Sequence, residues 1–238
     1  MARSAPKRQV NRLPPERRIS DIMAAAKEVF AEKGYSDALI TDIAQRAGVV
    51  EGSIYRFFAN KRELLVKVVE LWFEDLLLEE AEQFAAMRGV WNQIRFVVYH
   101  HLMSIRRDPA LSRLMFQEIR PSPDYRNSRL FELNRAYTNR LVEVIKTGVA
   151  SGELKRDSSP ALVRDVIFGC IEHRTWAFLR QEGDFDPVET ADAITNLVYS
   201  GLASEQPASP IGDLVTRLEA ATTRLETIAA PATPSKPL

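Results

Sequence analysis

The chain has 238 residues, of which 45% are hydrophobic and 27% charged, and its formal net charge is zero. This composition favours a packed globular chain over a disordered one. The single cysteine excludes an internal disulfide, and no apolar run approaches the ~20 residues that a membrane span needs. Because the basic N-terminus is not followed by the apolar segment of a secretory signal, we expect a soluble cytoplasmic protein.

The charges are unevenly distributed along the chain. Residues 1–64 contain 12 Lys and Arg against 8 Asp and Glu, whereas the remainder contains 20 against 24. Residues 1–18 alone hold six Lys or Arg and one Glu. A basic front on an acidic body indicates that the front binds a polyanion, although a basic tail that only improves solubility would have the same composition.

Three helices are predicted before residue 60. Apolar residues recur at helical spacing from Ile19 to Phe30, which predicts an amphipathic helix that Gly34 ends. A shorter helix is expected at about 39–47 and is stopped by Gly48. A third is expected at 51–58.

The rest of the chain continues with the same helical periodicity. Asn60 and Glu63 form a capping pair that begins a long helix at Lys61. Further amphipathic helices are expected at about 91–105, 111–119, 130–152, 160–181 and 187–203. Since no segment alternates with the period of a strand, the predicted fold is all-α.

The last two of these helices are predicted to form a dimer interface. Each begins with a capping residue followed by proline, at Ser159-Pro160 and at Asp186-Pro187. Both are apolar over a wide arc, and Val198 is expected at the interface. Small residues that would let two copies approach closely are Gly169, Ala193 and Gly201. A heptad seam at 211–228, which follows a polar linker, is the alternative interface.

Four regions follow from this reading. They are a basic flexible arm at 1–16, a DNA-binding unit at 17–64, a ligand-binding and dimerisation domain at 65–203, and a linker, helix and disordered tail at 204–238.

Three short helices with two tight breaks within about 40 residues are the layout of a helix-turn-helix unit. Gly48 can adopt the left-handed conformation that the turn needs. The positions expected to pack the second and third helices together are Ile43, Ala44, Val49, Ile54 and Phe58. The positions that then face outward are Gly52, Ser53, Tyr55 and Arg56.

These outward residues suit contact with DNA. A small residue at Gly52 allows close approach, and Ser53 and Arg56 can bind base edges or phosphates. Tyr55 offers a ring and a hydroxyl group. Lys61 lies at a helix N-terminus, where free N–H groups and the helix dipole favour an anion.

The run ITDIAQRAGVVEGSIYRFFANKRELL, residues 40–65, resembles the DNA-binding domain of the TetR family of bacterial repressors. It contains an IA-x-x-AGV, a G-[ST]-[IL]-Y and an F-x-x-K-x-x-L at the spacing of that family. The resemblance implies a homodimeric repressor that binds a palindromic operator through successive major grooves and is released by a small ligand. It also implies that Gly52, Ser53, Tyr55, Arg56 and Lys61 face the DNA.

Three positions depart from the pattern of the family. Val50 stands where Ser or Thr usually caps the third helix, so that cap is weak unless Glu51 partly replaces it. Ala38-Leu39 stands where a hydroxyl residue often caps the second helix. Phe57 replaces a His or Tyr. These changes bear on DNA affinity rather than on the fold.

Residues 123–201 also resemble TetR-type regulators of fatty-acid degradation, which respond to acyl-CoA. The expected partners are therefore operator DNA, a second copy of the chain and an apolar or acyl effector, with no membrane. Candidate residues for the effector site are His101, Met115, Phe131, Asn134, Tyr137, Arg174 and Trp176. Core packing alone would explain the apolar ones equally well.

Two polar candidates have alternative interpretations. Arg174 is placed on the apolar side of its helix, where it would need either a carboxylate of the protein or an anionic group of a ligand. His101 is interpreted as a core or pocket histidine, because adjacent His100 and His101 point about 100° apart and would rarely share a metal ion. We therefore expect no metal and no cofactor.

Two other classes of function were weighed. The sequence contains no nucleotide-binding loop, nucleophile elbow or metal-ligand spacing, so it is not predicted to be an enzyme. An all-α effector-binding or scaffolding protein without DNA binding is the alternative, which Val50 and Phe57 favour and Tyr55 and Arg56 oppose.

Overall fold

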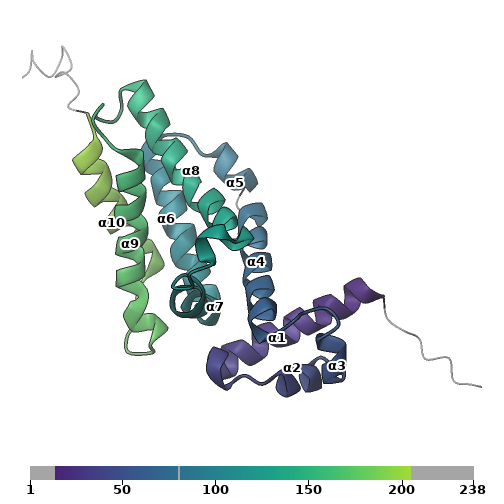
Figure 1. Ribbon diagram of the computed structural model, residues 1–238. Coiled ribbons are helices and arrows are strands. Elements are labelled where there is room, and N and C mark those ends of the chain that lie inside the picture. The colour runs from purple at the N-terminus through teal and green to yellow at the C-terminus, as the bar shows by residue number, and fades with distance from the viewer. Residues whose placement is uncertain (1–13, 80, 205–238) are drawn as a thin grey trace, which may run out of the picture.

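The computed structural model describes residues 14–79 and 81–204. Three helices form a head at one end of the molecule, and a fourth helix runs from this head into a larger body (Figure 1). The head and this connecting helix comprise α1 (Pro15–Asp37), α2 (Ile40–Arg46), α3 (Glu51–Ile54) and α4 (Lys61–Glu79). The predicted basic arm and the predicted heptad seam at 211–228 lie outside the described residues.

The body is built from long helices that lie side by side (Figure 1). Its elements are α5 (Ala81–Ala86), α6 (Val90–Arg107), α7 (Pro109–Leu114), the π-helix η1 (Met115–Ile119), the 3-10 turn η2 (Tyr125–Asn127), α8 (Arg129–Ser151), α9 (Pro160–Leu179) and α10 (Pro187–Leu202). The all-α prediction is confirmed. Within the described ranges no helix combines the length and the apolarity needed to cross a membrane.

The predicted helix ends are also confirmed. Gly34 leaves helical geometry with φ of 74°, and Gly48 takes a left-handed φ of 65° in the turn before α3. The Asn60 side chain accepts a hydrogen bond from the Glu63 amide at 2.9 Å. Ser159 and Asp186 cap α9 and α10 in the same way. Local sequence therefore determines where most helices begin and end.

The third helix is shorter than predicted. It ends at Ile54, and the expected last turn to Phe58 is irregular. The amides of Phe57 and Phe58 both donate to the Ile54 carbonyl, at 2.9 and 3.0 Å, which tightens the chain into a turn. The Ala59 amide then donates to the Glu63 carboxylate at 2.6 Å, so the start of α4 takes over the backbone that would have continued α3.

One apolar core continues from the head into the body. It includes Ile43 and Ile54 of the head, Leu65 of α4 and Met115 and Tyr137 of the body. A second core lies among α6, α8, α9 and α10. Because packed cores transmit displacement rather than absorb it, α4 connects the head mechanically to the body.

Candidate functional site

The helix-turn-helix unit has the packing that the sequence indicates. Ile43, Ala44, Ile54 and Phe58 are buried, and Val49 is partly buried against the same core. On the opposite side Gly52 and Arg56 are exposed, and 53% of the Tyr55 side chain is accessible. Ser53 is half-buried. The structure therefore presents a small residue, a ring, a hydroxyl and a guanidinium on one outward surface.

Ion pairs fix the angle at which α2 lies on α1. Arg46 donates two hydrogen bonds to the Glu32 carboxylate, at 2.6 and 2.7 Å, and this guanidinium lowers the pKa of Glu32. Asp42 accepts from Lys33 at 2.8 Å and from the Leu39 amide at 3.2 Å, and both hydrogen bonds lower its pKa. Asp42 thus satisfies the amide at the start of α2, where Leu39 has no capping group.

Lys61 does not lie where the sequence analysis expects it. Its ammonium group donates to the carbonyl oxygens of Tyr35, Ser36 and Ala38, at 2.7, 3.2 and 2.9 Å, and sits 4.6 Å from the centre of the Tyr35 ring. An ammonium group has three N–H bonds, so these contacts use all its donors. In this structure Lys61 ties the start of α4 to the end of α1 instead of projecting toward a phosphate.

The departures from the family pattern leave apolar side chains at the surface. Leu39 and Val50 precede α2 and α3 with 58% and 74% of their surface exposed, and neither helix has a side-chain cap. Glu51 makes no capping hydrogen bond in place of Val50. The ring of Phe57 is half-buried, with the Arg56 guanidinium 5.8 Å from its centre.

A cavity of about 530 Å³ lies in the body between α4, α6, α7, η1, α8 and α9. That volume is within the range typical of small-molecule sites. Four of the seven residues predicted for an effector site line it, namely His101, Met115, Phe131 and Asn134. Sequence reasoning did not identify Trp72, Phe73 and Phe168, which also line it. Their helical spacing equally fits core positions, so no local signal distinguishes them.

The other three predicted residues do not line the cavity. Tyr137 is buried behind it, with its ring 5.6 Å from that of His101. Trp176 packs on Phe116 at 5.9 Å between ring centres. Arg174 is exposed, so its predicted place on the apolar side of the helix is wrong. Neighbouring Thr175 occupies the buried face of α9, and successive residues are rotated by about 100°.

Arginines that the sequence analysis did not single out border the cavity instead. Arg120 pairs with Glu172 at 2.6 Å, and Arg164 pairs with Asp165 at 2.8 Å. Arg135 is exposed and makes no ion pair in the described part of the chain. Since these charged residues are more exposed than the aromatic lining, they mark the side of the cavity that opens to solvent.

The imidazole of His101 is held neutral by its surroundings. Burial, and secondarily the positive charge of Arg120, lower its pKa from 6.5 to about 4. Phe168 packs edge-on against it, 4.9 Å between ring centres. A neutral histidine can donate and accept one hydrogen bond each but carries no charge to attract an anion.

This lowered pKa predicts a stability change in mild acid. The folded state binds its proton less readily than the unfolded chain, so the free energy of unfolding is highest above pH 6.5 and falls as the pH is lowered toward 4. The loss is at most about 3 kcal/mol. Denaturant unfolding of wild type and His101→Gln between pH 4 and 7.5 measures it. The variant should lose roughly one proton of pH dependence, and identical slopes would contradict the assignment.

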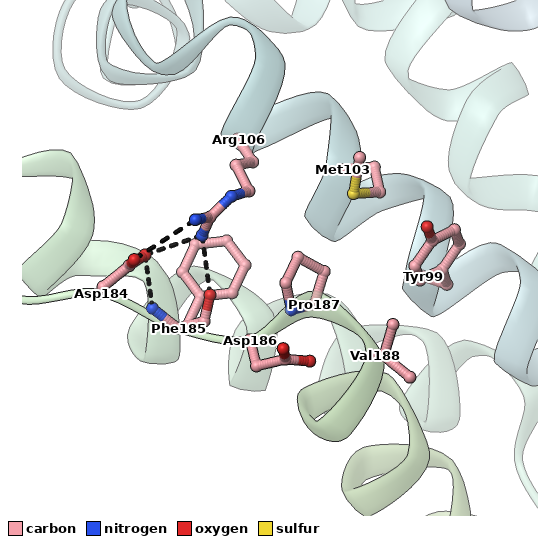
Figure 2. Close-up of a pocket in the computed structure, with 8 residues that line it drawn as sticks. All are labelled: Tyr99, Met103, Arg106, Asp184, Phe185, Asp186, Pro187 and Val188. Atoms are coloured by element: carbon pink, nitrogen blue, oxygen red, sulfur yellow. Dashed lines mark hydrogen bonds and ion pairs between the residues drawn. The ribbon is translucent and has the colours of Figure 1, made fainter.

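A second, shallower groove lies where α6 meets the start of α10 (Figure 2). Arg106 points from α6 to Asp184 and to the Phe185 carbonyl, at 2.7 and 2.8 Å, and lies over the rings of Phe178 and Phe185. The Asp184 carboxylate also accepts from the Phe185 amide at 2.8 Å. These contacts satisfy one another, so we interpret the groove as the clamp that positions α10.

The outer face of α9 and α10 exposes apolar side chains. Leu162 and Val166 of α9 are 62% and 50% exposed, and Leu197 of α10 is 75% exposed. The small residues Gly169, Ala193 and Gly201 are exposed on the same two helices. Val198, which was expected at the interface, packs partly into the core of its own chain. Leu197 is therefore the better probe of a dimer.

Known proteins resemble the chain along most of its length. A family model described as bacterial regulatory proteins of the tetR family matches residues 22–68, and a tetracyclin repressor-like C-terminal domain model matches residues 88–202. A CAP N-terminal conserved motif model matches residues 213–238, outside the described residues. Within the described ranges no group of three histidine, cysteine or acidic side chains could hold a metal ion.

Among similar proteins, the fatty acid metabolism regulator protein of Bacillus subtilis is 27% identical over 76% of this chain and 93% of its own. The crystal structure of FadR from Bacillus subtilis in complex with stearoyl-CoA covers 76% of this chain and 98% of its own, with a TM-score of 0.69. The repressor KstR2 of Mycobacterium tuberculosis is 23% identical over 79% of this chain and 94% of its own.

Proposed function

Because the chain belongs to the TetR family of bacterial regulatory proteins, we propose that it is a cytoplasmic, homodimeric transcriptional repressor released from its operator by an acyl-CoA. It acts by binding and not by catalysis. Tyr55, Arg56, Ser53 and Gly52 contact the operator, and the outer faces of α9 and α10 pair two copies in a four-helix bundle.

The observation that carries the proposal is the position of the cavity against α4. Trp72 and Phe73 of this helix line the cavity, while Leu64 and Leu65 near its other end pack in the core shared with the head. A ligand that fits best when α4 is tilted would change the spacing of the two recognition helices in a dimer. By linkage, it would then weaken DNA binding.

A second contact couples the body to the head. Lys27 of α1 forms an ion pair with Asp108 at the start of α7, at 2.6 Å. The segment that follows, α7 and η1, contributes Ser112, Met115 and Phe116 to the cavity wall. Displacement of this wall therefore reaches α1 directly as well as through α4.

Acyl-CoA fits the two halves of the cavity. Its aromatic and aliphatic lining suits an acyl chain, and its solvent side carries Arg120, Arg135 and Arg164 for the phosphates of the coenzyme. The stearoyl-CoA complex of the Bacillus subtilis FadR favours the same ligand class for this chain. The alternative of an effector-binding protein without DNA binding is disfavoured by the exposed Tyr55 and Arg56 of the head.

A titration tests this function. Palmitoyl-CoA added to the protein bound to DNA from upstream of its own gene should weaken binding by about 5- to 150-fold, the range of typical allosteric coupling. Free CoA should not. Arg135→Ala should reduce the response, because it removes the unpaired cation, whereas the exposed Arg174→Ala should not. Gel-shift assays provide the measurement, and a complex that no acyl-CoA loosens would refute the effector.

A further inference from the structure

Most polar groups that line the cavity are already satisfied within the protein. The Ser112 hydroxyl donates to the Asp108 carbonyl, and the Thr138 hydroxyl donates to the Asn134 carbonyl, each at 3.0 Å. The Asn134 amide donates to the Tyr125 hydroxyl at 2.9 Å. These residues therefore have fixed partners and are poorly placed to select a ligand.

Two lining residues differ in this respect. The indole Nε1 of Trp72 and the imidazole Nδ1 of His101 are buried and have no hydrogen-bond partner. Trp72 is only 8% exposed, so solvent does not hydrate its N–H group. Buried polar atoms without partners are rare in native structures because each is costly, and a bound molecule is one way to satisfy them.

The chemistry of the missing partner is restricted. Indole N–H can only donate, so its partner must be an acceptor. His101 is uncharged, and the rings of Phe168 and Tyr137 flank it. A carboxylate in such surroundings would be desolvated without a countercharge. The group that fits both side chains is a neutral oxygen, which accepts from Trp72 and either accepts from or donates to His101.

We propose that Trp72 and His101 recognise a neutral oxygen of the effector, a carbonyl or a hydroxyl, which lies between its hydrocarbon part and its anionic part. This inference rests on the proposed function only in placing the effector in this cavity. It departs from the expectation that His101 fixes an anionic head group, a role that belongs to the arginines on the solvent side. A purely hydrocarbon body next to the anion would leave both ring nitrogens unsatisfied.

Matched ligands isolate the oxygen. Palmitoyl-CoA and S-hexadecyl-CoA differ only in the thioester carbonyl, which the thioether lacks, and 3-hydroxypalmitoyl-CoA adds a hydroxyl group. Binding to the full-length protein without DNA is measured by isothermal titration calorimetry. Wild type should bind palmitoyl-CoA about tenfold more tightly than the thioether, as expected for one hydrogen bond to a buried group. If the hydroxyl is the recognised oxygen, 3-hydroxypalmitoyl-CoA should instead show the tenfold preference over both.

Variants assign the effect to residues. Trp72→Phe keeps an aromatic ring but removes the donor, so it should abolish the preference for the oxygen-bearing ligand while binding the thioether at least as well. His101→Leu is the second variant and should reduce the same ratio. Trp176→Phe makes the same change in a ring that does not line the cavity, and it should leave the ratio unchanged. Using a ratio cancels the general loss of packing that each variant causes.

Equal affinities of wild type for all three ligands would overturn the inference, and so would an unchanged preference in both Trp72→Phe and His101→Leu. No binding of any of the three would overturn it together with the acyl effector. Release of operator DNA by palmitoyl-CoA and the thioether alike, with equal affinities, would leave the proposed function standing and refute only the role of the oxygen. A tenfold preference without DNA release would do the reverse.

Discussion

Lys61→Met is expected to destabilise the head and to weaken DNA binding on every sequence, without reducing the dependence of affinity on salt. The ammonium group binds three carbonyl oxygens at the end of α1, where the helix dipole also favours a cation. Methionine fills a similar volume but offers no donor. The loss should be about 2–3 kcal/mol, as for hydrogen bonds made by a charged group.

Arg56→Ala is the comparison for this variant. Arg56 is exposed and makes no hydrogen bond in the described part of the chain, so its removal should leave the unfolding temperature unchanged. If it contacts a phosphate, the salt slope should fall by about one unit, and if it reads a base, sequence preference should relax. Thermal unfolding and fluorescence anisotropy at several salt concentrations separate the two variants. A stable Lys61→Met with a reduced slope would return Lys61 to the operator surface.

Leu197→Glu is expected to convert the dimer to monomers. Leu197 is 75% exposed on α10, and pairing two copies through this face would bury a carboxylate from each without a partner. The cost of about 3 kcal/mol or more corresponds to a loss of over ~100-fold in dimer affinity. Affinity for a two-half-site operator should fall with it, because each protomer then binds one half-site alone.

The chain provides a closely matched control. Leu78 of α4 is also 75% exposed but lies outside the α9–α10 face, so Leu78→Glu should remain dimeric. Light scattering coupled to size-exclusion chromatography measures the mass of both. Should Leu197→Glu stay dimeric, the interface would lie elsewhere, and the heptad seam at 211–228 would be the next segment to test.

The sequence predicted well those features that depend on local chemistry. Gly34, Gly48 and the capping side chains of Asn60, Ser159 and Asp186 act on their own neighbours, and the structure has the expected breaks and caps there. The short α3 was missed because its end depends on a hydrogen bond from Ala59 to Glu63, which belongs to the next helix.

Features that depend on how helices are rotated against each other were predicted less well. Lys61 sits at a helix N-terminus as expected, but the sequence does not reveal that the last carbonyls of α1 come within reach of its ammonium group. Arg174 and Thr175 are neighbours in sequence, and only packing decides which of them faces inward. The cavity likewise combines side chains of six elements, and no single helix carries a pattern that identifies it.

The π-helix η1 has a consequence for how this region can vary. The Arg120 amide donates to the Met115 carbonyl at 2.9 Å, five residues back, so the turn holds one residue more than an α-helical turn. Deleting one residue here would restore an unbroken α-helix from α7 onward. It would also rotate the wall-forming Met115 and Phe116 against Arg120 by roughly one residue's angle, about 100°. The number of residues in this turn is therefore constrained more tightly than their identity, and substitution would be tolerated where deletion would not.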